Sequence, residues 1–296
     1  MRRRSRLGLI AGAIVALGGA AADAPRADFV GRYVWKGSGP EFGGFSAIDF
    51  TDNGMTFVAV SDSANIFWGR LERGKAGAVT GVEVDPPIRP LSHHGTPVEN
   101  PMDDAEGVAI GTGGLLYVSY ETWNRIGIYE QNGRVWVHEI WPKPFFDFVV
   151  NGGAEALAID AEGALYAMPE RPIHQGDQIP VYRMKGDNWD VPFTLRRDGD
   201  WAPVGADFGP DGRLYLLERD YWGLIGFMTR VRRITLDGDR VVADEVLFET
   251  RAGQHDNLEG LAVWRDAEGA VRLTMISDDN FLPTQRTEIV DYRIRD

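Results

Sequence analysis

The chain of 296 residues contains no cysteine. Disulfide bonds and thiolate metal sites are therefore excluded, and so is a lipoprotein anchor, which requires a cysteine. Basic residues are also scarce: 31 lysines and arginines face 44 acidic residues, which gives a net charge of −13. Because no basic cluster occurs beyond the N-terminus, no nucleic-acid partner is expected. The acidity instead favours solubility and the binding of cations.

The familiar catalytic signatures are missing as well. The segment Gly44–Ile48 approaches the G-x-S-x-G nucleophile elbow but lacks its second glycine. The H-E-x-x-H, P-loop, G-x-G-x-x-G and EF-hand patterns do not occur. The sequence therefore indicates no activated nucleophile, and a bound metal ion or a purely binding role would each explain that absence.

Long apolar runs are absent except near the start of the chain. Residues 1–24 have the pattern of a signal peptide: four early arginines, the apolar run Leu7–Leu17 and a small-residue cleavage site at Ala20–Ala22. The run is too short to cross a membrane comfortably. We expect a periplasmic or secreted protein without a stable membrane span after cleavage. An uncleaved anchor is the alternative, and both Sec and twin-arginine export stay open.

One phrase recurs along the rest of the chain, an acidic residue followed by a small residue and an apolar strand. It is clearest in Asp104–Ile110, Ala154–Ile159 and Leu258–Val263, and weaker copies without the acid occur at Phe45–Asp49 and Val204–Phe208. Each copy is followed by a turn ending in glycine, a second apolar strand and another acid. Hairpins repeated every ~50 residues are typical of a β-propeller.

The repeats predict an all-β fold for residues 25–296, a single β-propeller domain. Six blades are expected, within a range of five to seven. The alternating segment Asp28–Lys36 is expected to pair with the last strand, Ile289–Ile294, within one blade. Such pairing closes the ring and removes the exposed sheet edge that would invite aggregation.

A propeller places these acids together. The innermost strand of each blade starts at one mouth of the central channel, and the second strand ends there. The predicted cluster comprises Glu106, Glu155 and Glu259 from the first strands, and Asp62, Glu121, Glu170, Glu218 and Asp278 from the second. So many carboxylates cannot all stay ionised without partners at low cost. Either Ca²⁺ or another divalent cation, or neighbouring arginines, would neutralise them.

Other candidate residues flank this cluster. Arg171 and Arg219 each follow a glutamate at what we take to be one structural position, where they would pair with neighbouring blades or bind an anionic substrate. Asp279 next to Asp278 adds a possible oxygen ligand. His255, four residues before Glu259, is a candidate substrate contact, or else a surface histidine.

Several of these stretches resemble the phytase-like family described as having esterase-like activity. They are Phe42–Ile48, Asp104–Gly107, Asn257–Ala262 and above all Ile276–Phe281 with Pro283–Thr287. The resemblance covers nearly all of the chain from Asp28 onward and implies a secreted or periplasmic β-propeller. The family name is taken from β-propeller phytases, whose acidic mouth holds Ca²⁺ that bridges to substrate phosphate. This chain departs from the pattern at Phe45 and Val204 and lacks a clear basic set for inositol phosphate.

Three functions follow as hypotheses. The first is a metal-assisted hydrolase of phosphate or carboxylic esters acting on a small anionic or ester substrate, and the second is a related lactonase. In the first, metal ligands or water-positioning groups would be Glu106, Glu155, Glu259, Asp278 and Asp279, the three glutamates being also the catalytic candidates. Arg171, Arg219 and His255 would contact the substrate. The third is a non-enzymatic propeller that binds a ligand or protein.

Overall fold

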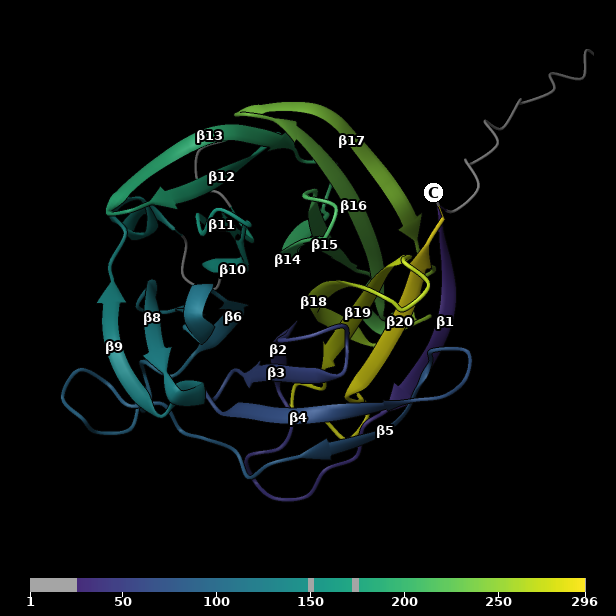
Figure 1. The fold of residues 1–296 in the computed structure, drawn as a ribbon, viewed down its shortest axis with the longest axis horizontal. Coiled ribbons are helices and arrows are strands. Elements are labelled where there is room, and N and C mark those ends of the chain that lie inside the picture. Colours follow the sequence, from purple (N-terminus) through teal and green to yellow (C-terminus); the bar gives the residue numbers. More distant parts are fainter. Residues whose placement is uncertain (1–25, 149–151, 172–175, 296) are drawn as a thin grey trace, which may run out of the picture.

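The computed structural model describes residues 26–148, 152–171 and 176–295. These residues form five four-stranded antiparallel sheets arranged as blades around a central axis (Figure 1). The prediction of an all-β single propeller is confirmed. The predicted signal peptide, residues 1–24, lies outside the described residues. Within the described part, no helix is long and apolar enough to span a membrane.

Each blade runs from the axis to the perimeter. Blade one contains β2 (Phe45–Phe50), β3 (Thr56–Ser61), β4 (Ile66–Arg73) and β5 (Val79–Val84). Blade two contains β6 (Ala105–Ile110), β7 (Leu116–Tyr120), β8 (Arg125–Glu130) and β9 (Val135–Ile140). Blade three contains β10 (Ala154–Ile159), β11 (Leu165–Pro169), β12 (Gln178–Lys185) and β13 (Asn188–Arg196). Blade four contains β14 (Ala202–Phe208), β15 (Leu214–Tyr221), β16 (Phe227–Asp237) and β17 (Arg240–Glu249). Short 3-10 helices occupy some connections: η1 (Thr112–Gly114), η2 (Gln131–Gly133), η3 (Lys143–Asp147) and η4 (Gly223–Ile225).

The fifth blade joins the two ends of the chain. Its strands, from the axis outward, are β18 (Asn257–Arg265), β19 (Val271–Asp278), β20 (Glu288–Ile294) and β1 (Ala27–Val34). The preferred count of six blades is therefore wrong, because the terminal strands complete the fifth blade instead of building another. The predicted ring closure is correct: β1 and β20 are antiparallel, with Ala27 opposite Ile294.

Every innermost strand carries a β-bulge at the same place. The pairing with the second strand skips one residue in each blade: Ser46, Glu106, Glu155, Val204 and Glu259. A bulge redirects the side chain of the extra residue, which explains why the acid of the repeated phrase leaves the regular strand alternation. It also corrects the alignment of blade one, where Ser46, and not Phe45, takes the place of the glutamate.

The glycine after the bulge serves blade packing. A Cβ atom on Gly205 would lie 2.4 Å from the Glu259 carbonyl oxygen, and one on Gly107 would lie 2.8 Å from the Glu155 carbonyl oxygen. Glycine therefore lets the innermost strand of the next blade approach closely. In the Glu-Gly phrase, the glutamate sits at the bulge and the glycine admits the neighbouring blade.

Apolar layers between neighbouring blades form the core. One layer joins blades four and five through residues such as Tyr215 and Met275. Another joins blades five and one, where Phe45 stacks on Trp35 with ring centroids 4.9 Å apart. At the channel end remote from the bulges, Asp49 accepts the Ile110 amide at 2.8 Å, and Asp207 accepts the Val263 amide at 2.6 Å. These two half-buried acids link blade one to blade two and blade four to blade five.

Candidate functional site: an acidic channel mouth

In four blades, the acid of the second strand occupies the same position relative to the inner hairpin. Asp62, Glu121, Glu170 and Asp278 each stand next to, or within, the last pair of the inner hairpin. Blade four differs, because Glu218 itself pairs with Pro203 and Arg219 occupies the place of the acid. Glu218 is fully buried away from the mouth, between Arg230 Nε at 2.7 Å and Arg232 Nη1 at 2.9 Å. Its predicted place in the mouth is wrong.

The same shift of one residue separates the two predicted arginines. Arg219 is equivalent to Glu170, whereas Arg171 lies one residue further along its blade. The expectation that both occupy one structural position is therefore wrong. Both still contact Glu170: Arg219 Nη2 lies 3.3 Å from Oε1, and Arg171 Nε lies 3.3 Å from Oε2. The side chain of Arg171 remains 64% exposed, against 22% for Arg219.

Arg219 is the centre of an ion-pair network on the blade four–five side of the mouth. It donates to the carboxylate of Glu259 and, at 2.7 Å, to Asn257 Oδ1. Asn257 Nδ2 in turn donates to Glu259 at 2.8 Å and to Asp278 at 3.4 Å. Burial alone would lower the pKa of Arg219, but Glu259, Glu155 and Glu170 raise it. Glu259 therefore has a cation and an amide as partners.

The blade one–five side holds two carboxyls that titrate near neutrality. Asp62 accepts a hydrogen bond from Ser46 Oγ, and burial followed by repulsion from Glu259 raises its pKa to about 7. Asp278 accepts the Asn280 amide at 2.6 Å, and burial with repulsion from Glu259 and Asp62 raises its pKa to about 8. Both can hold or release a proton near physiological pH.

The blade two–three side holds carboxyls with few or no partners. Asp104, Glu106 and Glu121 each offer an oxygen, and these oxygens all lie within 4.8 Å of one another. Glu155, on the next blade, is 9% exposed. Among the described residues, neither the Glu106 carboxylate nor the Glu155 carboxylate has a hydrogen-bond or ion-pair partner.

Mutual repulsion accompanies this lack of partners. Burial raises the pKa of Glu106 well above its ordinary value, and Glu155 is the next cause. Burial also raises the pKa of Glu155, with repulsion from Glu170 next and attraction to Arg219 opposing it. Glu121 is better satisfied, since Oε1 accepts the Gly153 amide at 2.7 Å. We call the whole set the acidic mouth: Asp62, Asp104, Glu106, Glu121, Glu155, Glu170, Glu259 and Asp278.

Two predicted site residues lie outside this network. Asp279 Oδ1 accepts the Gly44 amide at 3.0 Å, so it links blades five and one. His255 is 5% exposed, and its Nε2 lies 2.8 Å from the hydroxyl of Tyr292. Burial, with a smaller effect of Arg32, lowers the pKa of His255 to about 4, so the imidazole is neutral at physiological pH.

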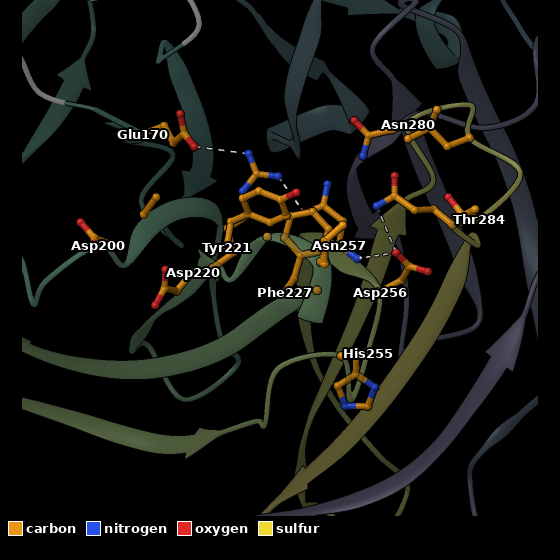
Figure 2. Close-up of a pocket in the computed structure, with 18 of the residues that line it drawn as sticks. Glu170, Asp200, Asp220, Tyr221, Phe227, His255, Asp256, Asn257, Asn280 and Thr284 are labelled. Carbon is orange, nitrogen blue, oxygen red and sulfur yellow. Dashed lines mark hydrogen bonds and ion pairs between the residues drawn. The ribbon is translucent and has the colours of Figure 1, made fainter.

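A cavity of about 1020 Å³ adjoins the mouth and is lined by residues of blades three, four and five and their connections. Glu170, Arg219 and Asn257 belong to both the cavity lining and the mouth network. Figure 2 shows Tyr221, Phe227 and Asn257 grouped in the lining, with His255 set apart from them. No sequence pattern predicted this cavity, because most of its lining residues lie in connections between strands.

Two members of the network were also missed. Asp104 and Asn257 each precede the bulge glutamate by two residues, in blades two and five respectively. Their polar side chains at one position of the repeat could have identified them. The prediction considered only the acids at the phrase start and at the end of the second strand.

A family model described as "Phytase-like: Esterase-like activity of phytase" matches residues 40–281. The chain belongs to this phytase-like family. A search of curated proteins finds no match. The three bulge glutamates and all five second-strand acids fall inside the family match, which ends at Phe281.

The solved structures to which this chain is similar are remote in sequence. The PQQ-bound aldose sugar dehydrogenase of Streptomyces coelicolor is 14% identical with a TM-score of 0.48, over 92% of this chain and 100% of that one. A Dyadobacter fermentans protein of unknown function is 14% identical with a TM-score of 0.44, over 84% and 76%. A putative gluconolactonase is 11% identical with a TM-score of 0.42, over 91% and 93%. None of these likenesses bears on what this chain binds.

Proposed function

We propose that this phytase-like propeller is a metal-assisted hydrolase of phosphate or carboxylic esters. The observation that carries the proposal is a group of converging carboxyls in the acidic mouth, of which Glu106 and Glu155 have no side-chain partner among the described residues. Asp104, Glu106 and Glu121 converge, and the largely buried Glu155 adjoins them on the next blade. Such a group is costly unless a cation or protons neutralise it. We propose that these four residues hold a divalent cation.

The donor set suits Ca²⁺. Calcium takes six to eight oxygen ligands at roughly 2.3–2.6 Å, so two oxygens on one ion are at most about 5 Å apart. The three converging carboxylates offer oxygens within 4.8 Å, which meets that limit. Thiolates are excluded because the chain has no cysteine. Glu259 and Asp278 border the same mouth, and we propose that they position water or substrate beside the ion, since each already has a protein partner.

The proposed chemistry needs no amino-acid nucleophile. When bound, a divalent cation would polarise the ester and offset the charge of an anionic substrate. Asp62 and Asp278 border the mouth, where they would accept a proton from water, and in the cation-free protein their pKa values are raised to about 7 and 8. Arg219 would hold Glu259 and Glu170 in place and, with Arg171, present a positive group to an anionic substrate.

Hydrolysis of matched chromogenic substrates tests the proposal. We expect the Ca²⁺-loaded protein to hydrolyse 4-nitrophenyl phosphate or 4-nitrophenyl acetate, or to open a lactone ring. We expect Glu106→Gln/Glu155→Gln to lower kcat at least 100-fold. The control Glu162→Gln/Glu268→Gln removes two exposed acids from turns at the other end of the channel and should keep full activity. A protein that binds Ca²⁺ but hydrolyses none of these substrates would favour the non-enzymatic binding propeller.

The site of action is a separate part of the proposal. The arginine-rich start and apolar run of residues 1–24 support export to the periplasm or the medium. Calcium is commonly more abundant outside the cytosol, as the millimolar affinities of extracellular calcium modules indicate. Sequencing the N-terminus of the mature protein, expected to begin after Ala22, tests this part.

A further inference from the structure

We propose that the cavity beside the acidic mouth recognises an amphiphilic organic anion, meaning a phosphate or carboxylate attached to an aromatic or alkyl group. The inference rests on the proposed function, because it names the substrate class that would reach the mouth. The cavity joins the acidic mouth at Glu170, which belongs to both, and at Arg219 and Asn257, which line the cavity and donate to Glu259 of the mouth. A ligand in the cavity would therefore place one end beside the carboxylates (Figure 2).

Arginines supply the anion-binding part of the cavity. Arg171, Arg197 and Arg286 line it together with Arg219, although the chain as a whole carries a charge of −13. Within the described residues the Arg197 guanidinium has no hydrogen-bond or ion-pair partner. The Arg171 side chain is 64% exposed and has only a 3.3 Å contact with Glu170. Guanidinium groups with free donors bind carboxylate and phosphate through paired hydrogen bonds.

Most acids in the lining are already engaged by the protein. Asp256 accepts the Arg286 amide at 2.9 Å, and Asp220 accepts Trp222 Nε1 at 2.7 Å. Glu170 is paired with Arg219 and Arg171. Asp200 lies away from Asn257, at the other side of the view in Figure 2. Arg197 and the exposed Arg171 therefore keep guanidinium donors for an anionic ligand.

Apolar side chains supply the other half of the recognition. Tyr221, Leu224, Phe227 and Leu282 line the same cavity. Leu224 is 108% exposed, Tyr221 64% and Leu282 52%, which leaves unusual apolar area facing water. Covering such area contributes about 25 cal/mol per Å². An aromatic or alkyl group on the ligand would cover it, whereas inorganic phosphate would not.

The size of the cavity favours a small molecule over a protein partner. Ligand pockets are roughly 300–1,000 Å³, and this cavity is about 1020 Å³. Polar side chains outnumber apolar ones in its lining, which suits a ligand with a charged end. Asn257 is 2% exposed and Arg219 is held by three neighbours, so the wall next to the mouth is preorganised.

Binding of non-hydrolysable phosphonates tests the inference apart from catalysis. Benzylphosphonate, methylphosphonate and benzyl alcohol would be titrated by calorimetry, with chelator and again with Ca²⁺. We expect benzylphosphonate to bind in both conditions, at least tenfold more tightly than either of the other two. The double variant Arg171→Gln/Arg197→Gln and the single variant Leu224→Ser should each weaken it at least fivefold. The control Arg240→Gln, at a 74% exposed arginine of the β16–β17 turn, should not.

The outcomes separate this inference from the proposed function. Equal affinity for methyl- and benzylphosphonate, no binding at all, or binding unaffected by the cavity variants would overturn the cavity assignment. In each of those cases, ester hydrolysis that depends on Glu106 and Glu155 would still support the proposed function. Conversely, benzylphosphonate binding that needs Arg197 and Leu224 would support the cavity even if no ester were hydrolysed.

Discussion

Arg219 of blade four donates to the carboxylate of Glu259 in blade five, in the position where the other blades place an acid. Blade four also has Val204 at its bulge in place of a glutamate. The mouth therefore has a paired side around Arg219 and a less satisfied side around Glu106 and Glu155. This asymmetry locates the proposed cation site at blades two and three.

Replacing Arg219 should leave the repulsion between the Glu170 and Glu259 carboxylates without a neutralising cation. We expect Arg219→Gln to destabilise the metal-free protein by about 3–5 kcal/mol, because Glu259 and Glu170 lose their cation in a largely buried place. Saturating Ca²⁺ should restore part of this stability. Urea denaturation with chelator and with Ca²⁺ would measure both effects, with Arg219→Lys as the variant that keeps the charge. A loss below about 1 kcal/mol would contradict the role of Arg219 as a neutralising group.

Glu218 should behave as a structural residue. Because it is fully buried between Arg230 and Arg232, Glu218→Gln would leave two buried guanidinium groups short of a partner. We expect a loss of about 3–5 kcal/mol in unfolding free energy and no change in Ca²⁺ affinity. Glu249, a 46% exposed partner of the same Arg230, is the matched control, and Glu249→Gln should cost less than about 1 kcal/mol. A weaker Ca²⁺ affinity of the Glu218→Gln variant would contradict this assignment and would indicate that Glu218 belongs to the cation site.

The glycine after the bulge should not tolerate a side chain. In Gly205→Ala the new Cβ would meet the Glu259 carbonyl oxygen at 2.4 Å, so the innermost strands of blades four and five would have to separate. We expect a loss of about 1–3 kcal/mol, measured by denaturant unfolding. Gly74→Ala is the control, since its nearest contact is the Thr80 methyl group at 3.3 Å. Equal stability of the two variants would disprove the packing explanation of the Glu-Gly phrase.

The metal-free protein should lose stability as pH rises. The folded-state pKa values of Asp62 and Asp278, about 7 and 8, exceed the ordinary 3.8. Between these values the folded state binds more protons than the unfolded state, so the unfolding free energy falls from about pH 4 to about pH 8. We expect Asp62→Asn to stabilise the chelator-treated protein relative to wild type, and by more at pH 8 than at pH 5. A gain that is constant or decreases with pH would contradict the shifted pKa of Asp62.

The sequence predicted the propeller because its local signals repeat. Each of these signals lies within a single hairpin, which is a local structure. They are the turn glycines, the alternating strands and the recurring Glu-Gly phrase. The blade count was harder, since the ends of the chain carry no phrase and their partners are far away in sequence. Ala27 opposite Ile294 is a pairing that only closure of the ring defines.

The sequence predicted that acids converge at one mouth of the channel, but the prediction for blade four was wrong. Glu218 comes one residue earlier in its hairpin than Glu121 and Glu170 do in theirs, so Arg219 takes the position in the mouth that was assigned to Glu218. A one-residue shift in a strand moves a side chain to the opposite face. Asp104 and Asn257 were missed for a similar reason, because their place beside the bulge is set by the bulge itself. The adjoining cavity depends on connections such as η4, whose conformation has no repeat to reveal it.

Calcium binding to the mature chain, measured by calorimetry, tests the central claim most directly. Wild type would be compared with Glu106→Gln/Glu155→Gln and with the charge-matched control Glu162→Gln/Glu268→Gln, each after chelator treatment. The account predicts binding by wild type and control, at least a 100-fold weaker affinity in the mouth variant, and a Ca²⁺-dependent rise in Tm for the first two alone. Equal Ca²⁺ binding by all three proteins, or no binding by wild type, would contradict a cation site in the acidic mouth.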